Sequence, residues 1–293
     1  MPKGTVLNYN ARSVTDPKEI ELLQSRAFRF GDAVFESILV RDGKPHFMGD
    51  HLERMMDGMD ILGFDFDEAV WVPKISSQLD QVLRENDLNG FARVRITVFR
   101  DGSGAYQPLS DTPCFLIEAT ELEADPWTMK PFKRIGIYHH VPIVASPLTR
   151  IKSANSLPYI MAARFAKQNK WDDSLLRSSD GYIIEGSMAN IFIVHAGTVF
   201  TPPVFGGCLP GIMRKNIIRI LRDKQITIVE KHLTILDLNV ADEVFLTNSI
   251  RGIIPVKKVV GSNFEPFEDQ MAPFIMKWIR EFTPPRHFDP ANN

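Results

Sequence analysis

A glutamate interrupts an apolar stretch in the second half of the sequence. Glu185 follows Ile183 and Ile184 in GYIIEGSMANIFIV, residues 181–194, a stretch that predicts a buried strand. Burying a lone carboxylate costs several kcal/mol unless a cation or hydrogen-bond donors compensate for it. We therefore expect a positively charged group beside Glu185, and other parts of the chain have to supply or hold that group.

A lysine upstream has the chemistry to bind an aldehyde. Lys152 falls between a predicted strand and a helix predicted for residues 157–167, which Ser153 or Asn155 can cap and whose first turn suits Pro158. Most lysines at strand ends are solvated, whereas a lysine that forms a Schiff base needs a desolvated amine with a lowered pKa. Lys152 by itself does not decide between these two roles.

Three further features can bind an anion. Gly211 and Ile212 stand at the start of a predicted helix in GGCLPGIMRKNII, where free N–H groups and the helix dipole favour a phosphate. Ser249 offers a hydroxyl in a turn after a predicted strand, and Arg54 lies on an early helix, one turn after His51. Each signal is weak alone, because such helix starts, turns and helix arginines are common.

Taken together, these features match the requirements of one cofactor, pyridoxal 5′-phosphate. It carries an aldehyde for a lysine, a ring nitrogen that a carboxylate can keep protonated, and a phosphate. Its pyridinium is the cation that Glu185 would pair with, because an opposite charge held close favours the protonated form. The hypothesis therefore rests on the joint occurrence of a buried glutamate, an imine-forming lysine, a phosphate-type helix start and an arginine.

The first half of the chain predicts a compact mixed domain. Two strands surround a turn at Asp42-Gly43, and two amphipathic helices follow at about residues 49–64 and 69–86. Two further strands are predicted at residues 91–102 and 114–122. Residues 123–131 combine charge with two prolines and no periodicity, which is typical of a linker. We therefore predict an N-terminal domain at 1–122, a linker at 123–131 and a second domain at 132–293.

The second half mixes strands and helices without strict alternation, so we expect two α+β domains rather than a doubly wound sheet. A hairpin is predicted to turn at Asp180-Gly181, directly before the Glu185 strand. The remaining predictions are strands at residues 133–144, 197–203, 226–231 and 243–249, and helices at residues 212–224 and 265–282.

Composition excludes several classes of protein. A net charge of −2 argues against nucleic-acid binding, and no apolar run approaches the roughly 20 residues of a membrane span. Cys114 and Cys208 form neither a metal-ligand spacing nor a disulfide framework, and the first ten residues have no apolar core. We expect a cytoplasmic protein without a signal peptide. The seven histidines include His139-His140 but no H-E-x-x-H spacing, so no metal site is expected.

From about Phe28 to Val256, the chain resembles the class IV pyridoxal-phosphate-dependent aminotransferases, also called fold-type IV. The family pattern has a Glu, then five residues later an Asn, an apolar residue and an aromatic one, supplied here by Glu185 and residues 190–192. It continues with an apolar-x-Thr at 199–201 and an apolar-x-Gly-apolar-x-basic run at 209–214, LPGIMR. A match in several parts with correct gaps is far more specific than one short motif.

The resemblance implies a role for each residue of the site. Lys152 would be the catalytic residue that forms an imine with pyridoxal 5′-phosphate, and Glu185 would face the ring nitrogen. Leu209 would pack against the ring, with Met188 near its edge. The phosphate would be held by Arg54, Gly211, Ile212 and Ser249.

The resemblance also implies an architecture and an assembly. We expect an N-terminal α/β sandwich domain and a C-terminal pseudobarrel domain, with the cofactor between them. The family is at least dimeric, so we expect a homodimer in which the partner subunit closes the pocket. The expected small-molecule partners are an amino acid and a 2-oxo acid.

Several positions bear on the reaction. The short KSAN followed by Ser156 resembles the D-amino-acid aminotransferases and the aminodeoxychorismate lyases. Branched-chain enzymes favour Tyr at the position of Phe30 and Gly-Thr at that of Asn248-Ser249, whereas the Phe-Glu pair in VFES is familiar from the aminotransferases. We expect an aminotransferase, with branched-chain amino acids among the candidate substrates. The alternative is aminodeoxychorismate lyase, which releases p-aminobenzoate and pyruvate; a non-catalytic relative would have no reason to keep both Lys152 and Glu185.

The substrate side of the site has two groups of candidates. Arg93, Arg95 and Arg100 can each grip a carboxylate through two N–H groups. Arg93 and Arg95 share one strand face and Arg100 has the opposite parity, so we do not expect all three in one pocket. An apolar substrate side chain would meet three aromatic residues, Phe30, Phe35 and Phe47.

Overall fold

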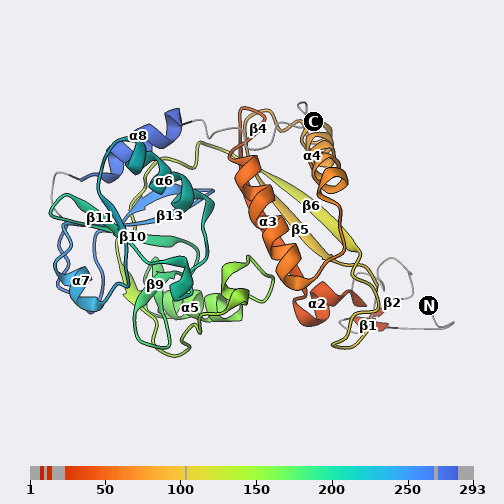
Figure 1. Ribbon diagram of the computed structural model, residues 1–293, viewed down its shortest axis with the longest axis horizontal. Coiled ribbons are helices and arrows are strands. Elements are labelled where there is room, and N and C mark those ends of the chain that lie inside the picture. Colours follow the sequence, from red (N-terminus) through yellow and green to blue (C-terminus); the bar gives the residue numbers. More distant parts are fainter. Residues whose placement is uncertain (1–6, 10–11, 15–23, 103, 267–269, 283–293) are drawn as a thin grey trace.

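The computed structural model describes residues 7–9, 12–14, 24–102, 104–266 and 270–282. The chain forms two lobes, each built on its own sheet, and Figure 1 shows them side by side. A four-stranded sheet has the order β4-β3-β5-β6, and an eight-stranded sheet forms the other lobe. The α+β class predicted from the sequence is therefore confirmed. Strands β1 (Leu7–Tyr9) and β2 (Arg12–Val14) form a separate antiparallel pair.

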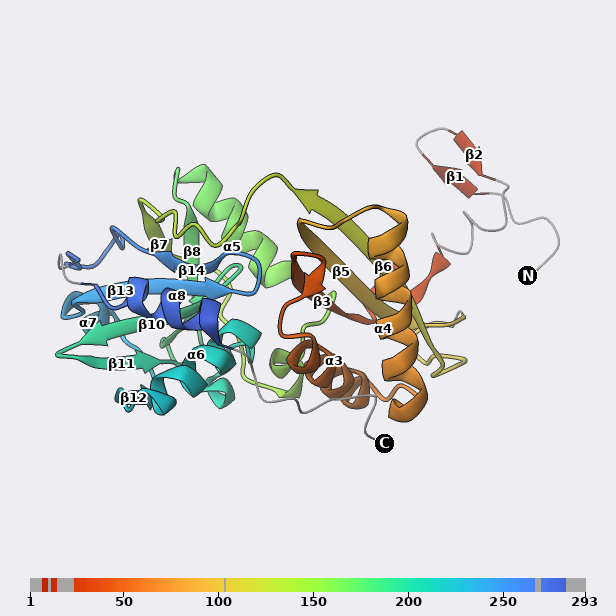
Figure 2. The same cartoon turned by 90° about the horizontal axis from the view of Figure 1, so that it is seen from above.

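The N-terminal lobe places two long helices on one face of an antiparallel sheet, as Figure 2 shows. Two residues with positive φ, Asp42 (50°) and Gly43 (68°), close the β3–β4 hairpin, as the Asp-Gly pair predicts. The elements of this lobe are α2 (Arg26–Phe30), β3 (Ala33–Arg41), β4 (Lys44–Pro45), α3 (Met48–Leu62), α4 (Glu68–Glu85), β5 (Phe91–Arg100) and β6 (Pro113–Leu122).

Alternation along β5 gives the first lobe two different faces. Ala92, Val94, Ile96 and Val98 are fully buried against the helices in one hydrophobic cluster. The odd-numbered residues of the strand point to the other face, which is not covered by α3 and α4. One face of this sheet therefore belongs to the hydrophobic core, and the other face can contribute side chains to a ligand-binding site.

The C-terminal lobe is an eight-stranded sheet, antiparallel apart from the pairs β7–β8 and β11–β12. Its strands are β7 (Ile135–Ile137), β8 (Asp173–Arg177), β9 (Ile183–Gly186), β10 (Asn190–His195), β11 (Thr198–Thr201), β12 (Ile228–Glu230), β13 (Glu243–Asn248) and β14 (Gly252–Pro255). Its helices are α5 (Leu157–Gln168), α6 (Ile212–Asp223), α7 (Ile235–Asn239) and α8 (Ala272–Glu281), with 3-10 turns η1 (Pro147–Arg150) and η2 (Val204–Gly206).

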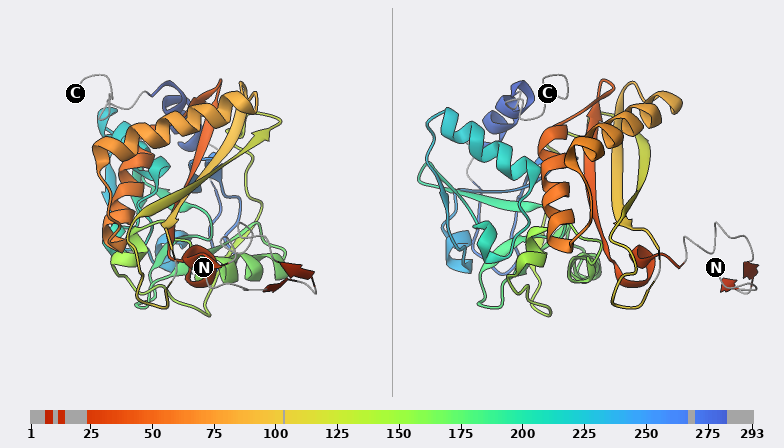
Figure 3. Two further views of the ribbon diagram at one scale, coloured as in Figure 1. Left: turned by 90° about the vertical axis from the view of Figure 1, so that its right-hand side faces the viewer. Right: turned by 45° about the vertical axis from the view of Figure 1, so that its right-hand side comes forward.

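Both faces of the second sheet are buried, which explains its continuous apolar runs. In β10, Phe192 and Val194 join a hydrophobic cluster with α6 and α8, whereas Ile191 and Ile193 join a second cluster on the opposite face. A strand with core on both sides needs no polar alternation. Figure 3 shows helices on the face of this sheet that is turned towards the first lobe.

The structure corrects the prediction of one strand through residues 181–194. The segment is two antiparallel strands, β9 and β10, joined by a tight turn in which the Gly186 N–H donates to the Ala189 carbonyl at 2.7 Å. A Cβ on Gly186 would lie 2.7 Å from Asp173 Oδ2, so a larger residue would displace the buried Asp173 side chain. The turn matters because it brings Asn190 opposite Glu185 in the ladder.

The start of α5 also differs from the prediction. The N-cap residue is Ser156, not Ser153 or Asn155, and its hydroxyl donates to the Ser153 carbonyl at 3.1 Å rather than to the helix. Pro158 does lie in the first turn, as predicted. Residues 152–154 instead continue as an extended segment that pairs with β3, which the local sequence did not indicate.

The segment between the two sheets is anchored by one large side chain. Trp127 is 1% exposed and packs with Phe47 of the first lobe and with the core around α8. The first sheet ends at Leu122 and the second begins at Ile135, so residues 123–131 lie between them; the domain limits themselves stay a prediction. Within the described ranges, no helix is both long and apolar enough to cross a membrane.

Candidate active site

A cavity of about 880 Å³ opens between the two lobes and is lined by both. The first lobe contributes α2, β3, β5 and α3, and the second contributes the segment before α5, the β9–β10 turn, the start of α6 and the β13–β14 turn. Of the predicted site residues, the following line it: Phe30, Phe35, Arg54, Arg93, Arg95, Lys152, Glu185, Met188, Leu209, Gly211, Ile212 and Ser249.

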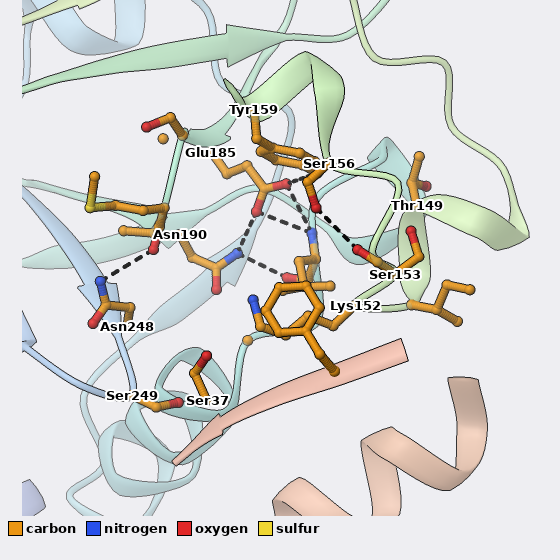
Figure 4. Close-up of a pocket in the computed structure, with 18 of the residues that line it drawn as sticks. Ser37, Thr149, Lys152, Ser153, Ser156, Tyr159, Glu185, Asn190, Asn248 and Ser249 are labelled. Carbon is orange, nitrogen blue, oxygen red and sulfur yellow. Dashed lines mark hydrogen bonds between the residues drawn. The ribbon is translucent and has the colours of Figure 1, made fainter. Parts of the chain in front are cut away.

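Glu185 is buried and surrounded by neutral donors. Its Oε1 accepts the Tyr159 hydroxyl at 2.8 Å, its Oε2 accepts Asn190 Nδ2 at 3.1 Å, and both oxygens accept the Leu209 N–H at 3.2 Å (Figure 4). Burial raises the pKa of Glu185 to about 7, although these donors act in the opposite direction. Lys152 and Arg214 also lower its pKa through their charges, but among the described residues neither they nor any other lysine or arginine lies within ion-pair distance of it.

Lys152 is positioned by the pairing of its own backbone with β3. Its carbonyl accepts the Phe35 N–H at 2.8 Å, and the neighbouring Ser153 bridges to Val34. The Lys152 Nζ lies 4.3 Å from the centre of the Phe35 ring. Burial and the nearby Arg54 charge lower the pKa of Lys152 to about 8, despite the opposing carboxylates. A larger fraction of its amine is therefore neutral near pH 7 than in a solvated lysine.

Arg54 is held by a second buried carboxylate, Glu36. Arg54 donates from Nε and Nη2 to Glu36 at 2.8 and 2.6 Å, and from Nη1 to the Pro210 carbonyl at 3.0 Å. The His51 Nδ1 lies 2.6 Å from the same carboxylate. Burial alone would raise the pKa of Glu36, but Arg54 and His51 hold it at about 2. Three of the five guanidinium N–H groups are used, which leaves two for an anion in the cavity.

The start of α6 is an uncapped helix N-terminus at the cavity wall. Gly211 is the N-cap residue and makes no side-chain cap, so the first N–H groups from Ile212 onward lack a capping partner. A Cβ on Gly211 would lie 1.9 Å from Asn190 Oδ1, so the Asn190 side chain occupies the space that any larger residue would need. Arg54, this helix start and Ser249 of the β13–β14 turn line the same cavity and form a set of donors suited to a phosphate.

Arg93 and Arg95 lie on the cavity face of β5, as their shared parity predicts. The Arg95 guanidinium lies 3.7 Å from the centre of the Phe35 ring, and its Nε donates to the Thr97 hydroxyl at 3.1 Å. Arg93 is exposed at the cavity. Both guanidiniums therefore face the space in which a substrate carboxylate would bind.

Two other candidates lie outside the cavity. Arg100 points to the opposite face of the sheet, where it pairs with Asp32 at 3.1 Å and Asp111 at 2.6 Å. Its donors are engaged in holding loops of the first lobe together, which corrects its assignment as a substrate-binding residue. Phe47 is packed against Trp127 with a centroid distance of 6.5 Å and belongs to the core.

Tyr159 and Glu36, which contact Glu185 and Arg54, escaped prediction, although the sequence carried a signal for each. Tyr159 lies on the buried stripe of α5, three and seven residues before the buried Ala162 and Ala166, so helical periodicity places it towards the sheet. Glu36 is a charged residue within the apolar strand β3 and is 1% exposed. As for Glu185, a glutamate within an apolar strand predicts a cation beside it, and for Glu36 that cation is Arg54.

The site therefore suits one kind of ligand. Such a ligand has a carbonyl for the amine of Lys152, a cationic ring atom for Glu185 and an anionic group for Arg54 and the start of α6. Pyridoxal phosphate has all three groups, and the residues present fit it. In the part of the chain that the structure describes, no cluster of three or more His, Cys, Asp or Glu side chains is arranged to hold a metal ion.

Comparisons with known proteins agree with this site. A family model described as amino-transferase class IV matches residues 33–259. The chain is 31% identical over 243 residues to a putative branched-chain-amino-acid aminotransferase of Methanocaldococcus jannaschii, covering 79% of this chain and 80% of that protein. It is 27% identical over 241 residues to the aminodeoxychorismate lyase of Bacillus subtilis, covering 81% and 80%.

The fold is shared with solved structures as well. A crystal structure of a putative 4-amino-4-deoxychorismate lyase from Legionella pneumophila aligns with a TM-score of 0.79 at 26% identity, over 88% of this chain and 94% of that one. The match of the family model covers well over half of the chain, including Lys152, Glu185 and the start of α6. This protein belongs to the class IV aminotransferase family and has its fold-type IV architecture.

Proposed function

We propose that this protein uses pyridoxal 5′-phosphate, attached to Lys152, to move an amino group between an amino acid and a 2-oxo acid. One observation carries the proposal. An amine with a pKa lowered to about 8 and a buried carboxylate that forms no ion pair with any described residue line one cavity, together with donors for a phosphate. A carboxylate in such surroundings is costly to keep ionised unless a bound cation stabilises it.

Each side chain has a defined task in this proposal. Arg54, the N–H groups at the start of α6 and Ser249 bind the phosphate, and Leu209 packs against the ring, with Met188 at the rim. Bound there, the cofactor would supply an aldehyde for amines and a ring that accepts the electron pair of the broken Cα–H bond. Glu185 holds a proton at the ring nitrogen.

Lys152 is the base of the proposed reaction. In its neutral form, the Nζ of Lys152 would take the proton from the Cα of a substrate bound in the cavity. The lowered pKa of Lys152 favours this role, because an amine of pKa about 8 is partly neutral at physiological pH. Arg93 and Arg95 would orient the substrate through its carboxylate, since both face the cavity.

The substrate class has two candidates, each supported by a relative. A branched-chain amino acid is supported by the 31% identical Methanocaldococcus jannaschii protein and by the apolar lining from Phe30, Phe35 and Ile151. Aminodeoxychorismate lyase activity is supported by the 27% identical Bacillus subtilis protein and the similar Legionella pneumophila structure. We take transamination as the first candidate, because the family model describes aminotransferases.

One experiment separates the candidates. Purified protein loaded with pyridoxal phosphate is given L-leucine, D-alanine and aminodeoxychorismate in turn. Conversion of the bound cofactor to its aminated form, with release of a 2-oxo acid, supports transamination and also reports the handedness of the substrate. Release of p-aminobenzoate and pyruvate from aminodeoxychorismate alone would contradict the aminotransferase and support the lyase.

A second experiment tests the role of Lys152. Borohydride treatment of the loaded protein should fix the cofactor covalently to the peptide that contains Lys152, as located by mass spectrometry. Lys152→Ala should abolish both this labelling and turnover, whereas Lys167→Ala, which changes an exposed lysine of α5, should retain both. Substantial transamination by Lys152→Ala would refute the assignment.

The assembly state is a further proposal. Leu148 of η1 and Leu157 and Ile160 of α5 are 57%, 66% and 50% exposed, and Leu148 and Ile160 also line the cavity. A patch of this kind supports burial against a second copy of the chain. Sedimentation should give a homodimer at micromolar concentration, and a monomer there would contradict it. A cytoplasmic location likewise stays a prediction.

A further inference from the structure

Helices α3 and α6 come from different lobes and meet beside the cavity (Figures 1 and 3). Their contact is polar and centres on Asp50 of α3, which is 7% exposed. Asp50 accepts Asn216 Nδ2 at 2.9 Å, Arg219 Nη1 at 3.0 Å and Lys215 Nζ at 2.8 Å. We call these four residues the α3–α6 clasp.

The clasp is charged and mostly shielded from water. Burial would raise the pKa of Asp50, but Lys215, Asn216 and Arg219 lower it, so its carboxylate is ionised at neutral pH. Asn216 is fully buried. A buried carboxylate that accepts several charged or polar donors in fixed directions restrains the helices that carry them more than a surface ion pair does. Asp50 is therefore the most buried charged contact between α3 and α6 in the part of the chain that the structure describes.

The clasp lies one turn from both parts of the phosphate-type site. Asp50 is four residues before Arg54 on α3, so the two side chains lie on the same face of the helix. On α6, Asn216 also donates to the Ile212 carbonyl at 3.0 Å, which ties it to the first turn of the helix. Outside the clasp, the described residues show two further bonds here: from Arg54 Nη1 to the Pro210 carbonyl at 3.0 Å, and from Lys215 to the half-exposed Glu53 at 2.6 Å.

The proposed phosphate donors therefore come from both lobes: Arg54 lies on α3 and the free N–H groups lie at the start of α6. Only noncovalent contacts between the lobes set the distance between these two groups of donors. A change of about 1 Å between Arg54 and the start of α6 would spoil hydrogen bonds, which need donor–acceptor distances near 2.9 Å. Glu36 holds the direction of the Arg54 guanidinium within the first lobe. It does not reach α6, so the distance between the lobes has to be set elsewhere.

We infer that Asp50 is a positioning residue for the phosphate of the cofactor, acting by docking α3 onto α6. This inference rests on the proposed function, since it concerns the phosphate of pyridoxal phosphate. A clasp that served stability alone would affect all ligands of the cavity equally. A clasp that positions the anion donors affects only ligands that carry the phosphate.

The experiment compares two ligands that differ by that group alone. Cofactor-free protein is titrated with pyridoxal phosphate and with pyridoxal, and both dissociation constants are measured by equilibrium absorbance. In Asp50→Asn, which keeps the size and loses the charge, affinity for pyridoxal phosphate should fall about tenfold, as expected when hydrogen bonds to a charged group are weakened. Affinity for pyridoxal should change by less than about twofold.

Glu53→Gln is the matched control. Glu53 also pairs with Lys215, at 2.6 Å, but its side chain is 54% exposed and does not join α6 through a buried bond. Both affinities should stay within about twofold of the wild type, because exposed ion pairs contribute little. Arg219→Gln, which leaves Asp50 paired with Lys215 and Asn216, should give a smaller phosphate-selective loss. It serves as the test if Asp50→Asn does not fold.

The outcomes separate the inference from the function on which it rests. Equal losses for both ligands, or no loss for either, would overturn the positioning role of Asp50 and leave the proposed function intact. A wild-type protein that binds neither ligand would overturn the proposed function, and the inference with it. A loss confined to pyridoxal phosphate would support both.

Discussion

Two buried glutamates of this site show how neighbours decide the character of a residue. Glu36 is 1% exposed and Glu185 is 3% exposed, yet the pKa is about 2 for the first and about 7 for the second. Glu36 meets the Arg54 guanidinium and the His51 ring, whereas Glu185 meets the neutral Tyr159 and backbone and amide donors. Glu36 is therefore already paired, and Glu185 is the carboxylate available to a bound cation.

Lys152 leads to a prediction about pH. Only its neutral amine can attack an aldehyde, and its pKa is lowered from 10.5 to about 8. The rate at which cofactor-free protein captures pyridoxal phosphate should rise with pH and level off above about 8, as followed by stopped-flow absorbance. A midpoint near 10.5, the value for a solvated lysine, would contradict the desolvated environment.

Tyr159 leads to a second prediction at this scale. Its hydroxyl donates to Glu185 and lowers the pKa of that carboxyl, so Tyr159→Phe should raise the pKa above about 7. The fraction of ionised Glu185 at neutral pH then falls, and it should hold a cationic ring less well. Infrared titration of the protonated carboxyl band in the cofactor-free protein measures the midpoint.

Tyr182→Phe is the control for this titration. Tyr182 stacks on His232 at a centroid distance of 4.6 Å, and its hydroxyl does not contact Glu185. The midpoint should therefore be that of the wild type. A midpoint that stays near 7 in Tyr159→Phe would show that the hydroxyl has no influence on Glu185.

At the scale of elements, the site depends on turns that bring strands and a helix start into close contact. The β9–β10 turn places Asn190 opposite Glu185, and Asn190 also donates to the Leu209 carbonyl at 2.9 Å. The same side chain lies where a Cβ on Gly211 would have to be. One asparagine thus joins the Glu185 carboxylate to the segment that leads into α6.

Gly211→Ala tests this close contact. The backbone at Gly211 has φ −64°, so alanine causes no backbone strain, but its Cβ would lie 1.9 Å from Asn190 Oδ1. Either Asn190 or the start of α6 has to move, and affinity for pyridoxal phosphate should fall about tenfold or more, as for the loss of hydrogen bonds to charged groups. Equilibrium titration measures it.

Gly49→Ala is the matched control for a glycine replaced by alanine. It lies in α3, where a Cβ would meet no atom within 4 Å, so affinity should be unchanged. Stability should increase by up to about 1 kcal/mol, because alanine favours the helix. Wild-type affinity in Gly211→Ala would show that Asn190 can move away without cost.

At the scale of the whole molecule, the site exists only where the two lobes meet. Residues 152–154 pair with β3 of the first lobe, Arg54 contacts Pro210 of the second, and Trp127 fills the space between the cores. The Trp127 indole N–H also donates to the Ser249 carbonyl at 3.4 Å, in the turn that lines the cavity. Packing between the lobes therefore supports the site directly.

Trp127→Ala tests this support. Removal of a fully buried aromatic side chain should lower the free energy of unfolding by about 3–5 kcal/mol, as measured by urea denaturation. Phe274→Ala removes an aromatic side chain that is 60% exposed and should change it by no more than about 0.5 kcal/mol. A loss below about 1 kcal/mol in Trp127→Ala would show that the lobes dock without this residue.

The sequence by itself determined the elements and the family. Helix α3, the β3–β4 hairpin and the two faces of β5 follow from spacings of two to four residues, which act within a short segment. The Lys152, Glu185 and LPGIMR motifs indicated the family that the comparisons confirmed. The roles of the individual site residues stay predictions, although all but Arg100 and Phe47 line one cavity.

Only the tertiary structure decided which distant residues meet. It split the predicted 181–194 strand at a turn, placed Phe47 in the core, and joined Tyr159 to Glu185 and Asp50 to α6. None of these contacts follows from local periodicity. Periodicity describes one short segment at a time, whereas each contact joins two different segments. The physical reason is that the energy of a buried carboxylate depends on the neighbours that packing of the two lobes brings to it.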